Sequence, residues 1–145
     1  MKLKQLEQNA VAFFESGFNC AESISQAILE AFTSDAPRDI PRVASALGGG
    51  IGGSHAEACG ALTGGVLAIG YLLGRDSADQ NVEATKELAK AYRTEFANIA
   101  GTTNCGVLLE KFGDENAKHE CTLLVGKATI ALAKLLRQHG LKMLR

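Results

Sequence analysis

Apolar residues recur at intervals of three and four positions along most of this 145-residue chain, and this spacing constrains the fold more than any other feature. Such a period places apolar side chains on one face of an α-helix. The sequence contains no sustained alternation of apolar and polar residues, which would indicate strands, and no Asn-Gly pair, which would indicate a hairpin. We therefore expect an all-α fold, a single domain over residues 1–145 with about six or seven helices.

The expected helices are separated by glycine, proline and asparagine residues, which commonly end or cap helices. They cover roughly residues 3–14, 20–31, 42–47, 55–73, 79–99, 105–112 and 118–138.

The apolar run from Ala61 to Leu73 spans 13 residues, too few for a membrane helix, which needs about 20. It is expected to be a buried core helix, with Ser54 and Glu57 forming a capping box at its start. Gly60 and Gly64 lie one turn apart in this segment, although each glycine costs about 1 kcal/mol relative to alanine inside a helix. A closely packed second backbone would offset that cost, so this Gly/Ala-rich helix is expected at the centre of the bundle.

The amino-acid composition excludes several classes of function. Lys and Arg number 15 against 16 Asp and Glu, a net charge of −1, so neither nucleic acid nor an anionic membrane surface is an expected partner. The first residues contain no apolar signal core, which predicts a cytoplasmic protein with nothing cleaved. Four cysteines are too few for a disulfide-stapled secreted scaffold, and a reducing compartment favours thiol, metal or cluster chemistry.

The cysteines stand at informative positions. Cys20 and Cys105 each follow a candidate capping asparagine and are expected at the first position of a helix. There the helix dipole and free N–H groups lower the pKa of a cysteine. Cys59 and Cys121 are expected about one turn inside their helices. An apolar stripe follows each of the four, so all four are expected to point inward, where they could converge.

Several chemistries are compatible with these four residues. They could exchange thiols and disulfides, with Cys20 and Cys105 attacking and Cys59 or Cys121 resolving, or they could bind an iron–sulfur cluster. A four-thiolate zinc site would be structural, and buried cysteines can also be simple core filler. No Cys-x-x-Cys pair occurs, which excludes a zinc ribbon and a thioredoxin-type motif.

The sequence resembles a known family. The segments Gly-Phe-Asn-Cys20-Ala-Glu, Gly48-Gly-Gly-Ile-Gly-Gly, Cys59-Gly-Ala-Leu-Thr-Gly-Gly and Asn104-Cys105, with a final Cys121, are similar to the CGAxxG four-cysteine family of redox-active proteins. The resemblance covers essentially the whole chain, and the four family cysteines match Cys20, Cys59, Cys105 and Cys121. It implies a small helical redox protein and supplies no substrate. A related region occurs in a multihaem cytochrome, but the haem-attachment Cys-x-x-Cys-His is missing here, so haem is not expected.

The glycine-rich segment before Cys59 and two histidines are further candidates for functional residues. Gly48, Gly50 and Gly53 match the letters of a dinucleotide fingerprint, but no strand is expected before them, so nucleotide binding is not expected. This loop could instead let backbone pass close to Cys59, or cover the site with its N–H groups facing sulfur or an anionic ligand. His55 and His119 are secondary candidates for metal ligands or proton donors, and solvated histidines are the ordinary alternative.

We thus expect a cytoplasmic redox protein whose partner is another protein, a small thiol or an electron donor, and which could form a homodimer. The rival hypothesis is a non-catalytic helical module with a zinc site or filler cysteines.

Overall fold

The computed structural model describes all residues, 1–145, and contains seven α-helices and no strand, as the sequence predicts. The helices are α1 (Leu3–Glu15), α2 (Cys20–Phe32), α3 (Ile40–Ala44), α4 (Gly60–Leu73), α5 (Glu83–Ala100), α6 (Cys105–Phe112) and α7 (Ala117–Gln138).

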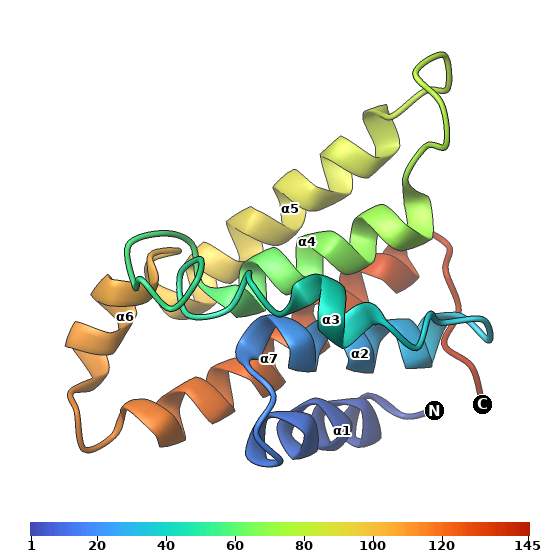
Figure 1. Cartoon of the computed structure of the whole chain (residues 1–145). Helices are drawn as coiled ribbons and strands as arrows, with labels where there is room; N and C mark the ends of the chain where they lie inside the picture. The colour runs from blue at the N-terminus through green and yellow to red at the C-terminus, as the bar shows by residue number, and fades with distance from the viewer.

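Three helices share one direction. In Figure 1, α2, α4 and α7 run from left to right, and the three pack against one another, while α5 returns in the opposite direction along α4 and α7. α1 covers the other side of α2 and α7. The N-terminal ends of α2, α4 and α7 therefore gather at the left of Figure 1, near the short helix α6. Both chain termini lie at the opposite end, where the Met1 ammonium donates to the Leu144 carbonyl at 2.6 Å.

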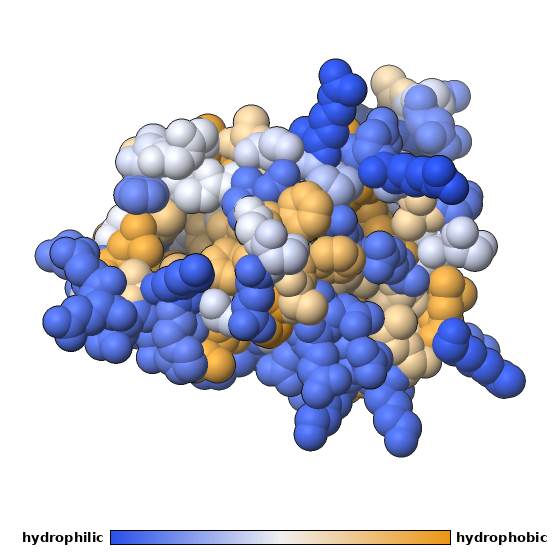
Figure 2. All heavy atoms as spheres, turned by 60° about the horizontal axis from the view of Figure 1, so that its bottom comes forward, coloured by the Kyte–Doolittle hydropathy of each residue, from blue (hydrophilic) through white to orange (hydrophobic).

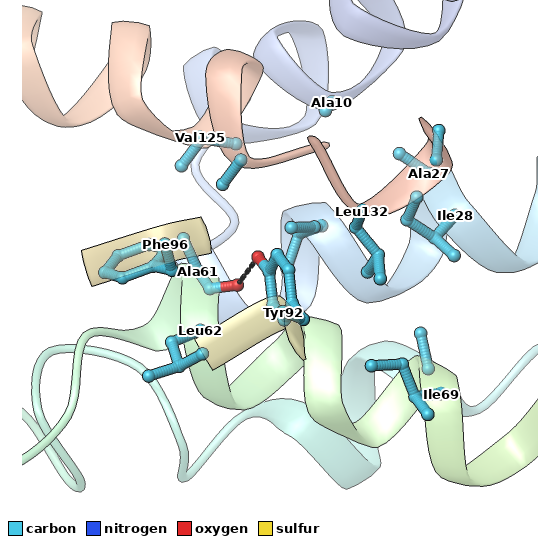
Figure 3. Close-up of a cluster of buried hydrophobic side chains, with 14 of the residues drawn as sticks. Ala10, Ala27, Ile28, Ala61, Leu62, Ile69, Tyr92, Phe96, Val125 and Leu132 are labelled. Atoms are coloured by element: carbon cyan, nitrogen blue, oxygen red, sulfur yellow. Dashed lines mark hydrogen bonds between the residues drawn. The ribbon is translucent and has the colours of Figure 1, made fainter. Parts of the chain in front are cut away.

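The core is one cluster of 25 buried residues, part of which is drawn in Figure 3. Tyr92 and Phe96 of α5 lie edge to face, with ring centroids 6.3 Å apart. The buried Tyr92 hydroxyl donates to the Ala61 carbonyl of α4 at 2.8 Å, the dashed line in Figure 3. This bond satisfies the polar end of an otherwise apolar side chain and ties α5 to the first turn of α4.

Small residues let the neighbours of α4 approach closely. A Cβ on Gly64 would lie 2.4 Å from the Ala21 carbonyl oxygen of α2, and one on Gly65 would lie 2.5 Å from the Tyr92 ring. The prediction of a closely packed second backbone is confirmed, and that backbone belongs to α2. The outward face of α4 remains exposed at Val66 and Tyr71, so α4 shares the centre of the bundle with α2 and α7.

The predicted start of α4 is wrong. The helix begins at Gly60, and Ser54 and Glu57 form no capping box: the Ser54 hydroxyl donates to the Gly50 carbonyl at 2.7 Å. The segment before α4 is instead held by pairing with a distant part of the chain, an isolated antiparallel bridge between Ala58 and Asn104. α5 also begins later than predicted, at Glu83 rather than near residue 79.

The surface is mixed in character. Figure 2 shows apolar atoms exposed among hydrophilic side chains on the face where α1 and α7 lie. None of the seven helices combines the length and the apolar character that a membrane crossing requires.

Candidate functional site

All four cysteines line one cavity of about 220 Å³ at the end of the bundle where the helix N-termini gather. Cys20 and Cys105 are the first residues of α2 and α6, Cys59 directly precedes α4, and Cys121 lies in the second turn of α7. The cysteines are free, and the remaining wall is mainly apolar, from α1, α6 and α7. The predicted position of Cys59 inside a helix is wrong, because α4 starts one residue later.

Asn19 fixes the start of α2 and with it the position of Cys20. The Asn19 side chain accepts a hydrogen bond from the Glu22 amide at 2.9 Å, and the Glu22 carboxylate accepts one from the Asn19 amide at 2.8 Å. This reciprocal pair is a capping box. Asn19 Nδ2 also donates to the Ser45 carbonyl at 3.0 Å. This bond anchors the chain that leads into residues 48–53, which we call the glycine loop.

Asn104 fixes the start of α6 and with it the position of Cys105. The Asn104 side chain accepts from the Val107 amide at 3.0 Å and donates through Nδ2 to the Ala56 carbonyl, also at 3.0 Å. Two backbone hydrogen bonds continue this pairing. The Cys59 amide donates to the Thr103 carbonyl at 2.7 Å, and the Cys105 amide donates to the Glu57 carbonyl at 2.9 Å. The bridge thus ties the segment before α4 to the start of α6, and Cys59 and Cys105 line the same cavity although they are distant in sequence.

The glycine loop closes over the sulfur of Cys20. Residues 49–53 all have positive φ, between 62° and 69°, so the backbone makes one left-handed turn that includes Ile51. This turn places the Gly49 amide against the Cys20 sulfur, and a Cβ on Gly50 would lie 2.7 Å from Cβ of Cys105. Of the two possibilities left open by the sequence, the second occurs, since the loop presents an N–H group to the sulfur of Cys20; its backbone also passes close to Cys105. The segment before the loop contains α3 and no strand, which is not the context of a dinucleotide fingerprint.

Hydrogen bonding makes Cys20 acidic. The Cys59 thiol, and after it the backbone amides of Gly49, Ala21 and Gly60, stabilise the Cys20 thiolate as hydrogen-bond donors and thereby lower its pKa. These donors outweigh burial, which alone would raise the value, and lower the pKa of Cys20 to about 6. The positive ends of the parallel helices act in the same direction. Cys20 is therefore largely a thiolate at neutral pH.

The other three cysteines are protonated at neutral pH. The pKa of Cys59 is raised far above its usual range because its thiol donates to the Cys20 thiolate and is buried. Burial, and then the negative charge of Cys20, raises the pKa of Cys105, and the same two causes raise the pKa of Cys121 to about 11. The prediction of a lowered pKa for Cys105 is wrong, because the first position of a helix does not compensate burial beside an existing thiolate.

The two histidines occupy different places. His55 is exposed, has a positive φ of 60°, and contributes to the lining of the cysteine cavity. His119 is exposed on α7 and does not line this cavity, so the structure does not bring it together with the cysteines. No three His, Cys, Asp or Glu side chains are arranged closely enough to hold a single metal ion.

Sequence reasoning missed three residues that shape this site. Glu22 completes the Asn19 capping box, and the pattern Asn-x-x-Glu could have indicated it. Gly60 packs directly against sulfur, since a Cβ there would lie 2.2 Å from Sγ of Cys20. The sequence left open that N–H groups of the glycine loop face sulfur, but it did not indicate Gly49 as the donor or Cys20 as the acceptor, because that contact depends on a non-local approach of the loop.

A family model described as "Putative redox-active protein (C_GCAxxG_C_C)" matches residues 18–135. The chain belongs to this family. The match begins just before Cys20 and includes all four cysteines and the CGAxxG segment at Cys59. No curated protein and no solved structure matches the chain.

Proposed function

We propose that this family member is a dithiol–disulfide redox protein in which Cys20 and Cys59 form the exchanging pair. The observation that carries the proposal is that Cys20 and Cys59 line one cavity, where the neighbouring Cys59 thiol lowers the pKa of Cys20 to about 6 while its own pKa is raised. A thiolate is the nucleophile in disulfide exchange, and a neighbouring thiol is needed to resolve the mixed disulfide.

The first step uses the charge of Cys20. Its thiolate attacks one sulfur of a disulfide R–S–S–R, the S–S bond of the substrate breaks, and a mixed disulfide Cys20–S–S–R forms. The electron pair of the broken bond leaves with the thiolate R–S⁻. The Cys59 thiol lies against the reacting sulfur and can transfer its proton to this leaving group, which departs as R–SH.

The second step follows from the loss of that charge. Once the Cys20 sulfur is part of a mixed disulfide, it no longer accepts the Cys59 proton or repels a second negative charge. Two of the causes that raise the pKa of Cys59 are thereby removed. The Cys59 thiolate attacks the Cys20 sulfur, a Cys20–Cys59 disulfide forms, and the second R–S⁻ leaves and takes a proton from water. The substrate disulfide is reduced to two thiols, and the protein dithiol is oxidised.

Return to the dithiol state needs two electrons from a thiol reductant, either a small thiol or the dithiol of a partner protein, by the reverse sequence. Cys105 and Cys121 are neutral thiols in the same cavity and do not compete with Cys20 for the attack.

Disulfide mapping tests the proposal directly. Reduced protein is treated with one equivalent of bis(2-hydroxyethyl) disulfide, quenched in acid, and digested for mass spectrometry. We expect a Cys20–Cys59 disulfide in the natural protein and in Cys105→Ser and Cys121→Ser. We expect Cys20→Ser to lose it, and Cys59→Ser to accumulate a mixed disulfide at Cys20. Oxidation that leaves Cys20 and Cys59 as free thiols would refute the proposal.

A second candidate function is favoured by the convergence of all four cysteines on one cavity. Four thiolates are the usual ligand set of an iron–sulfur cluster, which would supply one-electron transfer. Cys59, Cys105 and Cys121 would each have to lose a proton to become ligands, so assembly would release protons. Anaerobic reconstitution with ferrous iron and sulfide, followed by visible absorption and iron and sulfide analysis, tests this candidate. A colourless protein after reconstitution would count against it.

A further inference from the structure

The cavity beside Cys20 has room for more than the cysteine sulfurs, and its wall is unusual for a site that holds a thiolate. No Asp, Glu, Lys or Arg side chain lines it. The apolar part of the wall comes from Phe14, Leu108, Leu109, Leu124 and Val125. Apart from the cysteines, the polar groups at the cavity belong to Asn19, which is already engaged in helix capping, and to the exposed His55.

Size limits what can enter. The cavity measures about 220 Å³. An apolar cavity of about 150 Å³ is large enough for a benzene molecule, so this one suits a compound about half as large again. The tripeptide disulfide of glutathione, with its several charges, is far larger than this space.

Desolvation limits the charge of the ligand. A charged group moved into an apolar cavity loses its hydration, and no oppositely charged side chain or spare polar group in this wall would replace it. The Cys20 thiolate is already compensated by the Cys59 thiol and three backbone amides. The cavity is nevertheless accessible, because Leu109, Phe14 and Cys121 are each only half-buried and His55 at its edge is exposed.

From these observations we propose that the cavity is a substrate-binding site and that its substrates are small, uncharged, mainly apolar disulfides, which bind against the apolar wall with their sulfur–sulfur bond at Cys20. This inference rests on the proposed exchange at Cys20 and Cys59 and adds the class of substrate to it. The balanced reaction is unchanged: one dialkyl disulfide is reduced to two thiols, and Cys20 and Cys59 are oxidised to a disulfide.

Matched dialkyl disulfides test the inference. Diethyl disulfide, bis(2-hydroxyethyl) disulfide and cystamine share the same two-carbon arms, whose outer carbons carry a hydrogen atom, a hydroxyl group and an ammonium group, respectively. The rate of loss of the Cys20 thiolate is followed by its ultraviolet absorbance under single-turnover conditions. Each rate is divided by the rate of the same disulfide with free 2-mercaptoethanol, which removes differences in intrinsic reactivity.

We expect a normalised rate for diethyl disulfide at least about tenfold above that for cystamine, with the hydroxyethyl compound between them, because desolvation disfavours charge in the cavity. Simple attraction to a thiolate would favour the cationic cystamine, so the two physical causes predict opposite orders. A normalised rate for cystamine equal to or above that for diethyl disulfide would overturn the inference.

Two tryptophan variants on α6 place the binding in the cavity. Leu109→Trp enlarges a half-buried side chain of the wall, whereas Val107→Trp enlarges an exposed side chain on the same helix that does not line the cavity. We expect Leu109→Trp to slow diethyl disulfide by about tenfold or more, because the added ring occupies substrate space, and Val107→Trp to leave the rate unchanged. Equal rates in the two variants would contradict the inference.

Different results would refute the proposed exchange at Cys20 and Cys59 and the proposed substrate class. If the Cys20–Cys59 disulfide forms with every oxidant at the same normalised rate, the exchange at these cysteines stands and the substrate class is wrong. If no oxidant produces that disulfide, the proposed function itself is wrong.

Discussion

Gly60→Ala is expected to disturb both the stability of the protein and the thiolate at Cys20. The new Cβ would lie 2.2 Å from Sγ of Cys20, 3.0 Å from the Ala21 amide nitrogen and 3.1 Å from Cα of Gly48. Ordinary contact begins near 3.4 Å, and two of these three neighbours are backbone atoms. The added methyl group therefore cannot be accommodated by rotation of a flexible side chain alone.

Gly70→Ala provides the matched control. Gly70 lies in the same helix, and a Cβ there would meet no atom within 4 Å. Alanine at an open position inside a helix stabilises by about 1 kcal/mol relative to glycine. Overpacking typically costs about 1–3 kcal/mol, so the two variants should differ by about 2–4 kcal/mol in their free energy of unfolding. For a chain of this length, that difference corresponds to about 6–13 °C in Tm.

Thermal and urea unfolding of the reduced proteins measure this difference, and a pH titration of the thiolate absorbance provides a second readout. We expect the pKa of Cys20 to rise in Gly60→Ala, because a displaced sulfur loses the hydrogen bonds from Cys59 and from the backbone amides, and to stay unchanged in Gly70→Ala. The reasoning is refuted if the two variants agree within about 0.5 kcal/mol and both keep a low pKa at Cys20.

Three further outcomes are expected. The folded state holds Cys20 at a pKa of about 6 against about 9 when unfolded, so the free energy of unfolding should rise by about 4 kcal/mol between these pH values. It should fall again above about pH 9, because Cys121 ionises there in the unfolded state but stays protonated in the folded state, where its pKa is raised to about 11. Urea unfolding across pH checks both changes, and an unchanged rise in Cys20→Ser would contradict the assignment to Cys20. Asn19→Ala should destabilise the folded protein by about 1–2 kcal/mol and raise the pKa of Cys20. Asn104→Ala should destabilise it by a similar amount and leave the pKa of Cys20 unchanged. Equal pKa values of Cys20 in the two variants would argue against helix capping by Asn19 as the support of the Cys20 thiolate. Tyr92→Phe should cost about 1 kcal/mol, because the hydrogen bond to the Ala61 carbonyl is lost in the core; no loss in urea unfolding would show that this bond contributes nothing net.

Local sequence patterns were sufficient to predict most of the fold. The three-and-four spacing and the breaks between segments predicted six or seven helices and no strands, because helix formation and amphipathic burial depend on neighbours in sequence. The short helix α3 lies at Ile40–Ala44 rather than at the predicted residues 42–47. The caps at Asn19 and Asn104 were readable for the same reason, since a cap bonds to an amide three residues away. Ser54 and Glu57 have the same kind of pattern and form no cap. That segment is held by the Ala58–Asn104 bridge, which depends on residues far along the chain.

Local pattern put Cys20 and Cys105 at the first positions of two helices, and in isolation the two positions are equivalent. The tertiary structure made them different. It brought Gly49, Gly60 and the Cys59 thiol to the sulfur of Cys20, while Cys105 is buried beside the resulting negative charge. The pKa of a thiol depends on how many donors reach it and how much water it loses, and both are set by segments that approach through space. The sequence therefore determined which residues could carry the chemistry, and the packing of distant segments decided that Cys20 is the thiolate.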